Sequence, residues 1–391
     1  MKEIFLVFLR LGCYAFGGPT AHMGYFHEEF VKRRKWLSEA DYADTVALCQ
    51  FLPGPSSSQA GFAIGLDRGG ITGAFLAWIG FTLPSAILMI AFALGLEYAG
   101  DLSTAGWVSG LKLVAVAVVA NAAWGMAKSL CPDRSRATIA ALVTLGLLLA
   151  ATPLAQLVAI LIGGVAGYIL YRKQDHTSQV KPTHQAGSKR MGAIYLGIFF
   201  ILLAGLPIAS QLSPQNEALE VGDAFYRAGS LVFGGGHVVL PLLDSYTVQQ
   251  GWIDESSFLA GYGAAQALPG PLFAFSSFLG AGINKGPGGI SGGIYALVMI
   301  YLPAWLLVLG AIPFWARLRK INAARAALLG ANAAVVGLLF AALYDPIWQS
   351  TINSNLSFGF ALVAFILLKF WKMPPWLLAA LGAGLGQLLL G

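Results

Sequence analysis

The chain has 391 residues, of which 57% are hydrophobic and only 11% are charged, and its formal net charge is +6. Soluble domains carry about 25% charged residues, so the composition excludes a soluble domain and gives no support for a nucleic-acid partner. Five stretches without any charge reach the roughly 20 residues that cross a bilayer: residues 69–96, 137–171, 191–216, 256–284 and 286–316. We therefore predict an all-α polytopic membrane protein, embedded in the lipid bilayer.

The same motifs occur twice along the chain. Arg10-Leu-Gly-Cys-Tyr-Ala-Phe-Gly-Gly-Pro19 recurs 217 positions later as Arg227-Ala-Gly-Ser-Leu-Val-Phe-Gly-Gly-Gly236, and five of the ten aligned positions are identical. Gln50-Phe-Leu-Pro-Gly-Pro55 recurs as Gln266-Ala-Leu-Pro-Gly-Pro271. We predict two homologous transmembrane halves, residues 1–172 and 222–391. Residues 173–221 form a polar cytoplasmic linker that leads into a linker transmembrane helix at about 191–211.

The other apolar stretches predict the remaining membrane-spanning helices. Residues 137–171 would form one helix of about 52 Å, which is too long for a single crossing, and Thr152-Pro153 is a natural turn within it. The predicted spans are about 71–96, 106–128, two short helices in 137–171, and then about 290–313, 325–344, 355–370 and 374–390.

The charge distribution indicates how the segments around the repeated motifs meet the membrane. Cytoplasmic loops carry an excess of lysine and arginine. Suppose that each segment around a motif enters and leaves the membrane by the same face; these segments are residues 4–35 and 38–66 and their copies 222–241 and 256–284. Then 20 of the 24 basic residues are cytoplasmic. The linker helix adds a single crossing between the halves, so the second half then has an inverted orientation. The alternative is six full crossings per half plus the linker helix.

The motifs break the helices in a chemically specific way. Proline cannot continue a helix, but it begins one well because its missing N–H lies among the unpaired donors of the first turn. We therefore expect helices to begin at Gly17-Gly18-Pro19 and after Pro53-Gly54-Pro55. A helix that begins within the membrane presents free N–H groups and partial positive charge to an anion. Such breaks at matching places in two halves indicate a transporter's substrate site; the alternative is a set of packing kinks.

Charged residues within the apolar sequence are candidate ligands. Arg10 lies seven residues, about two helical turns, before Gly17, and an arginine inside a membrane is usually functional. Arg227 is its repeat partner, but Asp223 precedes it by four residues, which is ion-pair spacing. Arg10 is therefore the freer cation. Lys112 is either a second substrate cation or an interfacial anchor.

The halves differ in the polar side chains beside the breaks. Ser56–Ser58 follow the first Pro-Gly-Pro motif, whereas Leu272–Ala274 follow the second, so we expect a site weighted toward the first half. His22 and His237 follow the glycine breaks, where each either carries a proton or donates a hydrogen bond. The predicted substrate-binding residues are Arg10, Gly17, Gly18, Pro19, His22, Gln50, Pro53, Gly54, Pro55, Ser56, Ser57, Ser58, Gln59, Lys112, Arg227, Gly235, His237, Gln266 and Gly270.

These motifs resemble the chromate ion transporter family in its long, two-domain form. The resemblance covers nearly the whole chain and rests on Phe16-Gly-Gly-Pro19, the run from Gln50 to Gln59, Phe233-Gly-Gly-Gly236 and Leu268-Pro-Gly-Pro271. It implies oppositely oriented halves and efflux of chromate from the bacterial cytoplasm across the inner membrane, which confers chromate resistance, with sulfate as a further anion. It also implies that Arg10 and the segments 16–19 and 50–59 form the functional region.

The substrate class that these residues favour is a small tetrahedral oxyanion, because the candidate ligands are hydrogen-bond donors. Chromate and sulfate both fit this description. A dianion that leaves a negative cell interior gains about 2 × 2.3 kcal/mol per 100 mV. The membrane potential alone, or together with a proton gradient, therefore suffices to drive export by a secondary transporter.

Several other assignments are weighed against this one. A sulfate or related oxyanion transporter, including an uptake system, is the first alternative, followed by a channel and, more distantly, a membrane enzyme acting on anionic headgroups. No enzymatic activity, cofactor or metal is expected, because the sequence contains no His, Asp and Glu cluster with ligand spacing. A homodimer is an open alternative for the assembly.

Overall fold

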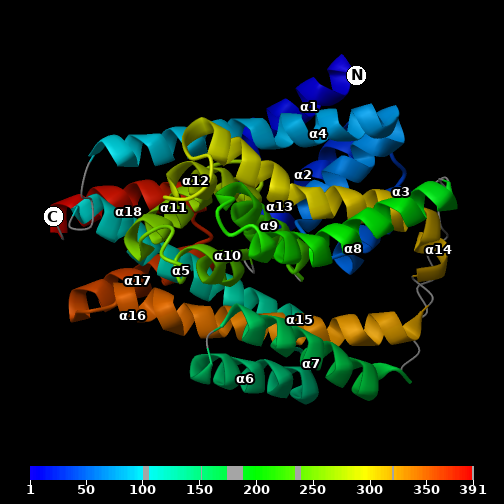
Figure 1. The fold of residues 1–391 in the computed structure, drawn as a ribbon. Helices are drawn as coiled ribbons and strands as arrows, with labels where there is room; N and C mark the ends of the chain where they lie inside the picture. The colour runs from blue at the N-terminus through cyan, green and yellow to red at the C-terminus, as the bar shows by residue number, and fades with distance from the viewer. Residues whose placement is uncertain (100–104, 151, 174–187, 234–238, 319–320, 390–391) are drawn as a thin grey trace.

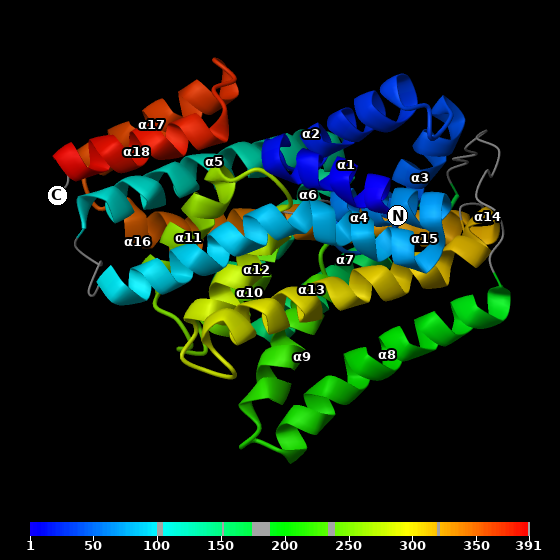
Figure 2. The ribbon, with the colours of Figure 1, turned by 90° about the horizontal axis from the view of Figure 1, so that it is seen from above.

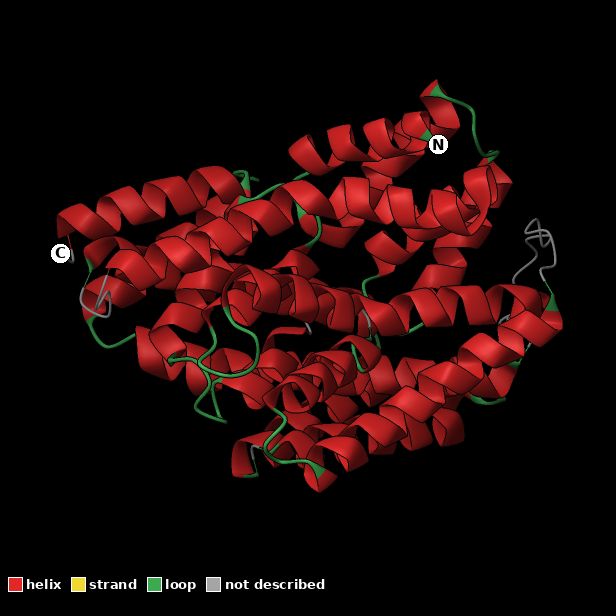
Figure 3. Cartoon of the chain, turned by 45° about the horizontal axis from the view of Figure 1, so that its top comes forward, coloured by secondary structure: helices red, strands yellow, loops and turns green. Residues whose placement is uncertain are grey.

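The computed structural model describes residues 1–99, 105–150, 152–173, 188–233, 239–318 and 321–389. These residues form helices and connecting loops without a β-strand among them, as Figure 1 and Figure 3 show. In this described part, six helical stretches are long and apolar enough to cross a membrane: Ser56–Leu96, Gly106–Leu130, Leu154–Tyr171, Lys189–Leu212, Gly289–Leu318 and Asn322–Thr351. The prediction of an all-α, multi-pass membrane protein is confirmed.

The first glycine break is the tip of a helical hairpin. Helix α1 (Lys2–Tyr14) ends before the break, α2 (Gly18–Phe26) begins after it, and α2 continues into the π-helix η1 (His27–Arg33). The Arg34 guanidinium lies 2.8 Å from the Glu3 carboxylate, so the chain has returned to the end where α1 began. At 1.5 Å per residue α1 is about 20 Å long, shorter than the hydrocarbon core of about 30 Å. This segment therefore forms a hairpin, which is the path that a re-entrant segment requires.

The first Pro-Gly-Pro motif is the tip of a second hairpin. Helix α3 (Glu39–Phe51) leads to it, and α4 (Ser56–Ala99) begins behind it and kinks just after Arg68, where two glycines leave helical geometry. The Arg34 and Arg68 guanidinium groups lie 5.6 and 5.1 Å from the centre of the Trp36 ring. Arg68 has thus come back to the face that carries Arg34. The part of α4 beyond its kink makes the crossing to the opposite face.

The next helices follow the predicted spans. They are α5 (Gly106–Leu130), α6 (Arg134–Leu149), α7 (Pro153–Tyr171) and the linker helix α8 (Lys189–Leu212). The predicted turn between α6 and α7 is present, and the Thr152 hydroxyl accepts a hydrogen bond from the Ala155 N–H at 3.1 Å, which caps α7. Helix α8 lies along one edge of the molecule (Figure 2). Only 11% of its most apolar 18-residue stretch is buried within the protein, so most of its surface faces lipid.

The second half repeats this order with local differences. Its elements are α9 (Glu217–Ser230), α10 (Val239–Thr247), α11 (Glu255–Ala267), η3 (Leu272–Ala274), α12 (Phe275–Gly282), α13 (Gly289–Ala311), η4 (Ile312–Phe314), α14 (Trp315–Leu318), α15 (Asn322–Ala342), η5 (Leu343–Trp348), α16 (Gln349–Thr351), α17 (Asn355–Lys369) and α18 (Pro375–Leu389). The 3₁₀ turn η3 precedes α12, whereas α4 follows its Pro-Gly-Pro motif directly. A loop also separates α12 from α13, whereas the corresponding parts of α4 are joined through its kink.

The two halves exchange their last helices. Helix α18 of the second half packs on α5 of the first, and α7 of the first half packs on α15 of the second. A Cβ atom on Gly110 would lie 1.9 Å from the Gly382 carbonyl oxygen, and one on Gly330 would lie 2.0 Å from the Gly163 carbonyl oxygen. Gly110 and Gly330 are repeat partners, as are Gly163 and Gly382, so the contact is reciprocal, which is typical of a two-fold relation. Because α8 adds one crossing between the halves, they form an inverted repeat.

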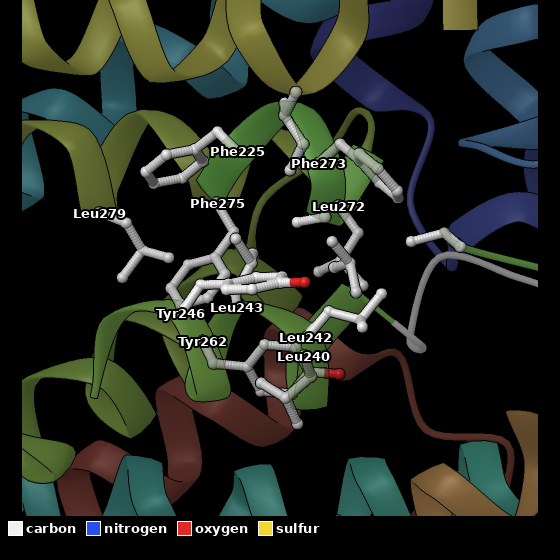
Figure 4. Packing of buried hydrophobic residues seen from close by; sticks show 14 of the residues in the cluster. Phe225, Leu240, Leu242, Leu243, Tyr246, Tyr262, Leu272, Phe273, Phe275 and Leu279 are labelled. Atoms are coloured by element: carbon white, nitrogen blue, oxygen red, sulfur yellow. The ribbon is translucent and has the colours of Figure 1, made fainter. Parts of the chain in front are cut away.

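The broken segments of the second half are packed more deeply than those of the first. Figure 4 shows buried side chains from α9, α10 and α12, among them Phe225, Tyr246 and Phe275, which fill the space between these helices. Helix α1 by contrast leaves one face open, where Leu6 is 48% and Tyr14 is 38% exposed. The repeat is therefore symmetric in its chain path but not in its burial.

Replacing Gly110 by alanine would place a methyl group against the Gly382 backbone, which cannot move aside as a side-chain tip can. We expect Gly110→Ala to destabilise the protein by about 1–3 kcal/mol, the usual effect of overpacking. The measurement is thermal unfolding in detergent. Gly146→Ala is the control, since a Cβ atom there meets nothing within 4 Å. Equal melting of the two variants would contradict the exchanged helix packing.

Candidate anion site

The breaks of the two halves meet through two crossed backbone hydrogen bonds. The Gly54 N–H donates to the Val232 carbonyl at 2.7 Å, and the Gly270 N–H donates to the Ala15 carbonyl at 2.9 Å. Gly54 and Gly270 are the central glycines of the two Pro-Gly-Pro motifs, and Ala15 and Val232 immediately precede the two Phe-Gly-Gly motifs. Each Pro-Gly-Pro turn is thus bound to the glycine break of the other half, and the broken segments converge in the interior.

Both of these turns require glycine. Gly54 and Gly270 have positive φ values of 118° and 95°, which side-chain-bearing residues rarely adopt. A Cβ atom on Gly54 would lie 2.8 Å from Gln59 Nε2, and one on Gly270 would lie 2.9 Å from the Ser85 hydroxyl. The two motifs therefore adopt the same conformation and are closely packed in both halves.

A cavity of about 110 Å³ lies where the first glycine break meets the second Pro-Gly-Pro motif. Its polar lining comes from Gly17 and Gly18 of the first break, Asn121 of α5, and Gln266 and Gly270 of the second half. Gly17, with φ of 98°, is the N-cap of α2, so the unpaired N–H groups of the first helical turn lie here. The described lining contains no charged side chain. Neutral donors at a helix N-terminus form an arrangement that binds anions.

The cavity contains four of the predicted site residues, Gly17, Gly18, Gln266 and Gly270, and Pro19 adjoins them in the first turn of α2. It also contains Asn121, which the sequence reasoning missed. Asn121 is the one amide in the apolar run 113–127, a signal that could have identified it. The lining draws on both halves, whereas a site weighted toward the first half was expected.

His22, in α2, makes hydrogen bonds to the first glycine break and to the start of α4. It is 1% exposed, with Nε2 3.1 Å from the Ala15 carbonyl oxygen and Nδ1 3.2 Å from the Ser57 hydroxyl. A carbonyl can only accept, so Nε2 carries a proton and donates to Ala15, and with a neutral ring Ser57 donates to Nδ1. Because Gly270 also donates to the Ala15 carbonyl, His22 supports one of the two crossed hydrogen bonds.

The polar run after the first Pro-Gly-Pro motif contacts other parts of the protein. Ser58 is 3% exposed and lies 3.3 Å from the Tyr301 hydroxyl of α13, in the other half. Gln59 donates from Nε2 to the Pro53 carbonyl at 2.7 Å and so closes the turn from inside. Ser56 is half-buried and, like these residues, does not line the cavity. The run holds the two halves together beside the cavity.

Two of the predicted cations and Gln50 lie away from this lining. Arg10 is exposed on the face of α1 turned away from α4, with its guanidinium 6.0 Å from the centre of the Tyr14 ring. Lys112 donates from Nζ to the Ser256 hydroxyl at 3.0 Å, and Ser256 lines a second cavity of about 870 Å³. Gln50 is exposed at the end of α3. The structure therefore separates these side chains from the α2 N-terminus.

Arg227 forms the ion pair with Asp223 that its sequence spacing predicts. Its guanidinium also lies 4.8 Å from the centre of the Tyr246 ring. Asp223 is 2% exposed, so Arg227 neutralises a buried carboxylate. Gly235 and His237, the remaining predicted site residues of the second half, lie outside the described residues.

An inverted repeat of transmembrane helices whose breaks converge on a small polar cavity is typical of transporters. The chain belongs to the chromate transporter family, whose sequence profile matches residues 2–168 and again residues 219–387. The resemblance in the motifs and the multi-pass bacterial membrane location are thereby confirmed. No solved structure matches the chain at a significant level.

Named relatives match nearly the whole chain. A chromate transport protein of Cupriavidus metallidurans is 26% identical over 394 residues, which cover 99% of this chain and 92% of the relative. A probable chromate transport protein of Synechococcus elongatus is 26% identical, with coverage of 95% and 90%. An uncharacterized transporter of Methanocaldococcus jannaschii is 28% identical, with coverage of 99% and 94%.

Removing the Arg227 side chain would leave the buried Asp223 carboxylate without its partner. Such a change costs about 3–5 kcal/mol, so we expect Arg227→Ala to lower the melting temperature strongly and the added Asp223→Asn to restore most of the loss. Arg10→Ala removes an exposed side chain and should stay within about 0.5 kcal/mol of the wild type. Thermal unfolding of the variants in one detergent checks this. An equal loss in Arg10→Ala would refute the difference between the two arginines.

Proposed function

We propose that the protein is a secondary transporter that exports chromate from the bacterial cytoplasm across the inner membrane and confers chromate resistance. One observation carries the proposal: the cavity combines the N-terminus of α2 in one half with the Pro-Gly-Pro turn of the other, beside the crossed hydrogen bonds. A site built from both halves opens to either face when one half moves against the other. The moving units are residues 1–172 and 222–391, joined by residues 173–221.

The chemistry of the lining supports a tetrahedral dianion as substrate. The N–H groups at the start of α2 and the amides of Asn121 and Gln266 are donors, and the partial positive charge of the helix N-terminus adds to them. The described lining has no carboxylate that would repel the anion. Among oxyanions of this shape, the relatives' names favour chromate.

The membrane potential supports export over uptake. A dianion moving outward from a negative interior gains about 4.6 kcal/mol per 100 mV. Uptake would have to overcome the same energy through a coupled ion. Export therefore requires no co-substrate, although a proton gradient can add to its driving force.

The crossed hydrogen bonds suggest how the site changes its exposure. A single backbone hydrogen bond contributes about 0.5–1.5 kcal/mol net, so it can break and reform within a transport cycle. His22 and Ser57 reinforce the Ala15 side, whereas the equivalent positions in the second half hold Val239 and Phe273, which lack hydrogen-bonding groups. We expect the bond between Gly54 and Val232 to open first and the Ala15 side to act as the pivot.

The separated cations fit the two ends of such a pathway. Arg10 lies on α1, which leads directly to the glycine break at the cavity. We propose that it attracts the oxyanion on the cytoplasmic approach. Lys112, bound to Ser256 beside the larger cavity, lies toward the opposite face and would meet the anion on release.

Sulfate transport, including uptake, is the second candidate, because neutral donors at a helix N-terminus suit sulfate as well as chromate. A membrane enzyme has less support. Ser57 and His22 do pair at 3.2 Å as a nucleophile and base would, but they are 3% and 1% exposed. Neither side chain lines either of the two cavities.

Replacing Gln266 by glutamate introduces a negative charge into the cavity with almost no change of shape. At about 4 Å and an effective dielectric of 20, each pair of like charges costs about 4 kcal/mol, so we expect chromate transport to fall by more than about 100-fold. Gln50→Glu, at the exposed repeat position, is the matched control and should retain most activity. Equal loss in both variants, with both proteins folded, would contradict the placement of the site.

The proposed function is tested by chromate flux into or out of proteoliposomes with an imposed membrane potential and no pH gradient. We expect potential-driven chromate movement that is strongly reduced in Arg10→Ala while the variant remains folded, because the anion is no longer attracted on the approach. Sulfate and phosphate are assayed in parallel as competing oxyanions. Sulfate flux without chromate flux would select the second candidate, and no oxyanion flux under any gradient would reject the function.

A further inference from the structure

Asp244 is a buried carboxyl group outside the proposed anion site. It lies near the end of α10, is 4% exposed, and belongs to none of the membrane-spanning helices of the described chain. The chain after α10 leads to Trp252, which borders the 870 Å³ cavity. That cavity is also lined by Leu96 near the end of α4 and Val108 near the start of α5, so it lies at the face opposite the Glu3–Arg34 ion pair.

The Asp244 carboxyl group is poorly supplied with hydrogen-bond donors. Oδ2 accepts one hydrogen bond from Gln249 Nε2 at 3.0 Å. Oδ1 is buried and has no hydrogen-bond partner among the described residues. An ionised carboxylate offers about four acceptor sites, and buried charged groups are normally paired or fully hydrogen-bonded. One neutral donor is far short of that requirement.

The charged groups that act on Asp244 have the same sign. Glu255, in the first turn of α11, and Asp345, in η5, are both close enough to interact with it electrostatically, and both disfavour its ionised form. No basic group appears among these interactions. The electrostatic surroundings therefore add to the effect of burial.

The other elements packed against α10 do not supply a compensating cation at this position. On α9, Arg227 is bound to Asp223. On α7, the facing group is the neutral amide of Gln156, which donates to the Ser245 hydroxyl. The charged residue of α15 is Arg325, in the first turn of that helix. Within the described chain, the negative charge of an ionised Asp244 would thus be uncompensated.

A buried carboxylate in such surroundings binds a proton rather than staying charged. We propose that Asp244 is a proton-binding site of the transporter that exchanges its proton with the solution on the outer face. Burial, followed by the charges of Glu255 and Asp345, raises the pKa of Asp244 to about 7. A group with this pKa both holds and releases a proton at physiological pH.

Glu255 provides a route for the proton. It lines the 870 Å³ cavity, and its Oε1 atom is buried without a hydrogen-bond partner in the described part of the chain. A proton leaving Asp244 can therefore pass to Glu255 and then to water in the cavity.

Protonation here has a physical consequence for export, a step that rests on the proposed function. A dianion released at the outer face would be repelled by ionised Asp244, Glu255 and Asp345. Binding a proton at Asp244 removes one of these charges, so acidic conditions outside should speed chromate release. Return of the protonated group would carry a proton inward against the outgoing anion.

The protonation is tested without any transport by infrared spectroscopy of the purified protein between pH 5 and pH 9. We expect the C=O stretch of a protonated carboxylic acid that disappears near pH 7 in the wild type and is missing in Asp244→Asn. Asparagine has the shape of the neutral acid, so the variant should fold normally. Absence of such a band in the wild type, its persistence in Asp244→Asn, or failure of that variant to fold would each overturn the proton site.

The coupling is tested by chromate and proton flux in proteoliposomes of fixed orientation at external pH 6 and pH 8. A group that titrates near 7 changes its protonated-to-ionised ratio about 100-fold over this range, and we expect a several-fold faster wild-type efflux at pH 6. Asp244→Asn should retain chromate flux but lose most of this pH dependence. Glu220→Gln is the matched control, because Glu220 is 38% exposed and already paired with Lys285 at 2.6 Å.

The two proposals fail in different ways. Normal chromate flux in the wild type, with the same pH dependence in Asp244→Asn, would overturn the coupling and leave the transport function standing. Loss of pH dependence in Glu220→Gln as well would assign the effect to general surface charge. No oxyanion flux in the wild type would reject the proposed function, while the infrared titration would still decide whether Asp244 holds a proton.

Discussion

The structure depends on the two crossed backbone hydrogen bonds between Gly54 and Val232 and between Gly270 and Ala15. Chain breaks inside a membrane leave N–H and C=O groups unpaired, and such groups are tolerated only where protein or a polar cavity satisfies them. Here backbone groups at the breaks of one half form hydrogen bonds with backbone groups at the breaks of the other half. This constraint forces the halves together at their breaks, and the 110 Å³ polar cavity lies beside one of these crossings.

The duplication supplies symmetry in the backbone and asymmetry in the side chains. His22 and Ser57 reinforce one crossing with buried hydrogen bonds, while Val239 and Phe273 leave the other without them. The second half has instead enclosed its broken segments in a tightly packed core (Figure 4), which buries Asp223 beside Arg227. The two halves thus provide different side-chain chemistry at one interface.

Sequence reasoning was most successful where the governing interaction is local. Proline and glycine chemistry placed the starts of α2 and α4, basic residues placed the hairpin ends on one face, and four-residue spacing predicted the ion pair of Asp223 with Arg227. It missed Asn121, and only the structure shows that Ser57 pairs with His22 from 35 residues away. Those partners are brought together by packing between helices, which local spacing does not record.

The sequence by itself therefore determined the number of halves, the positions of the breaks, the membrane spans and the inverted orientation, because these follow from hydropathy, helix chemistry and charge along the chain. The tertiary structure alone decided which breaks meet, and that Gln266 lines the cavity while Gln50 is exposed. It also decided that α18 packs on α5 and that Asp244 Oδ1 is buried without a hydrogen-bond partner in the described chain. The physical reason is that burial and electrostatic environment depend on residues distant in sequence, and in this protein those residues belong to the opposite half or to other helices of the fold.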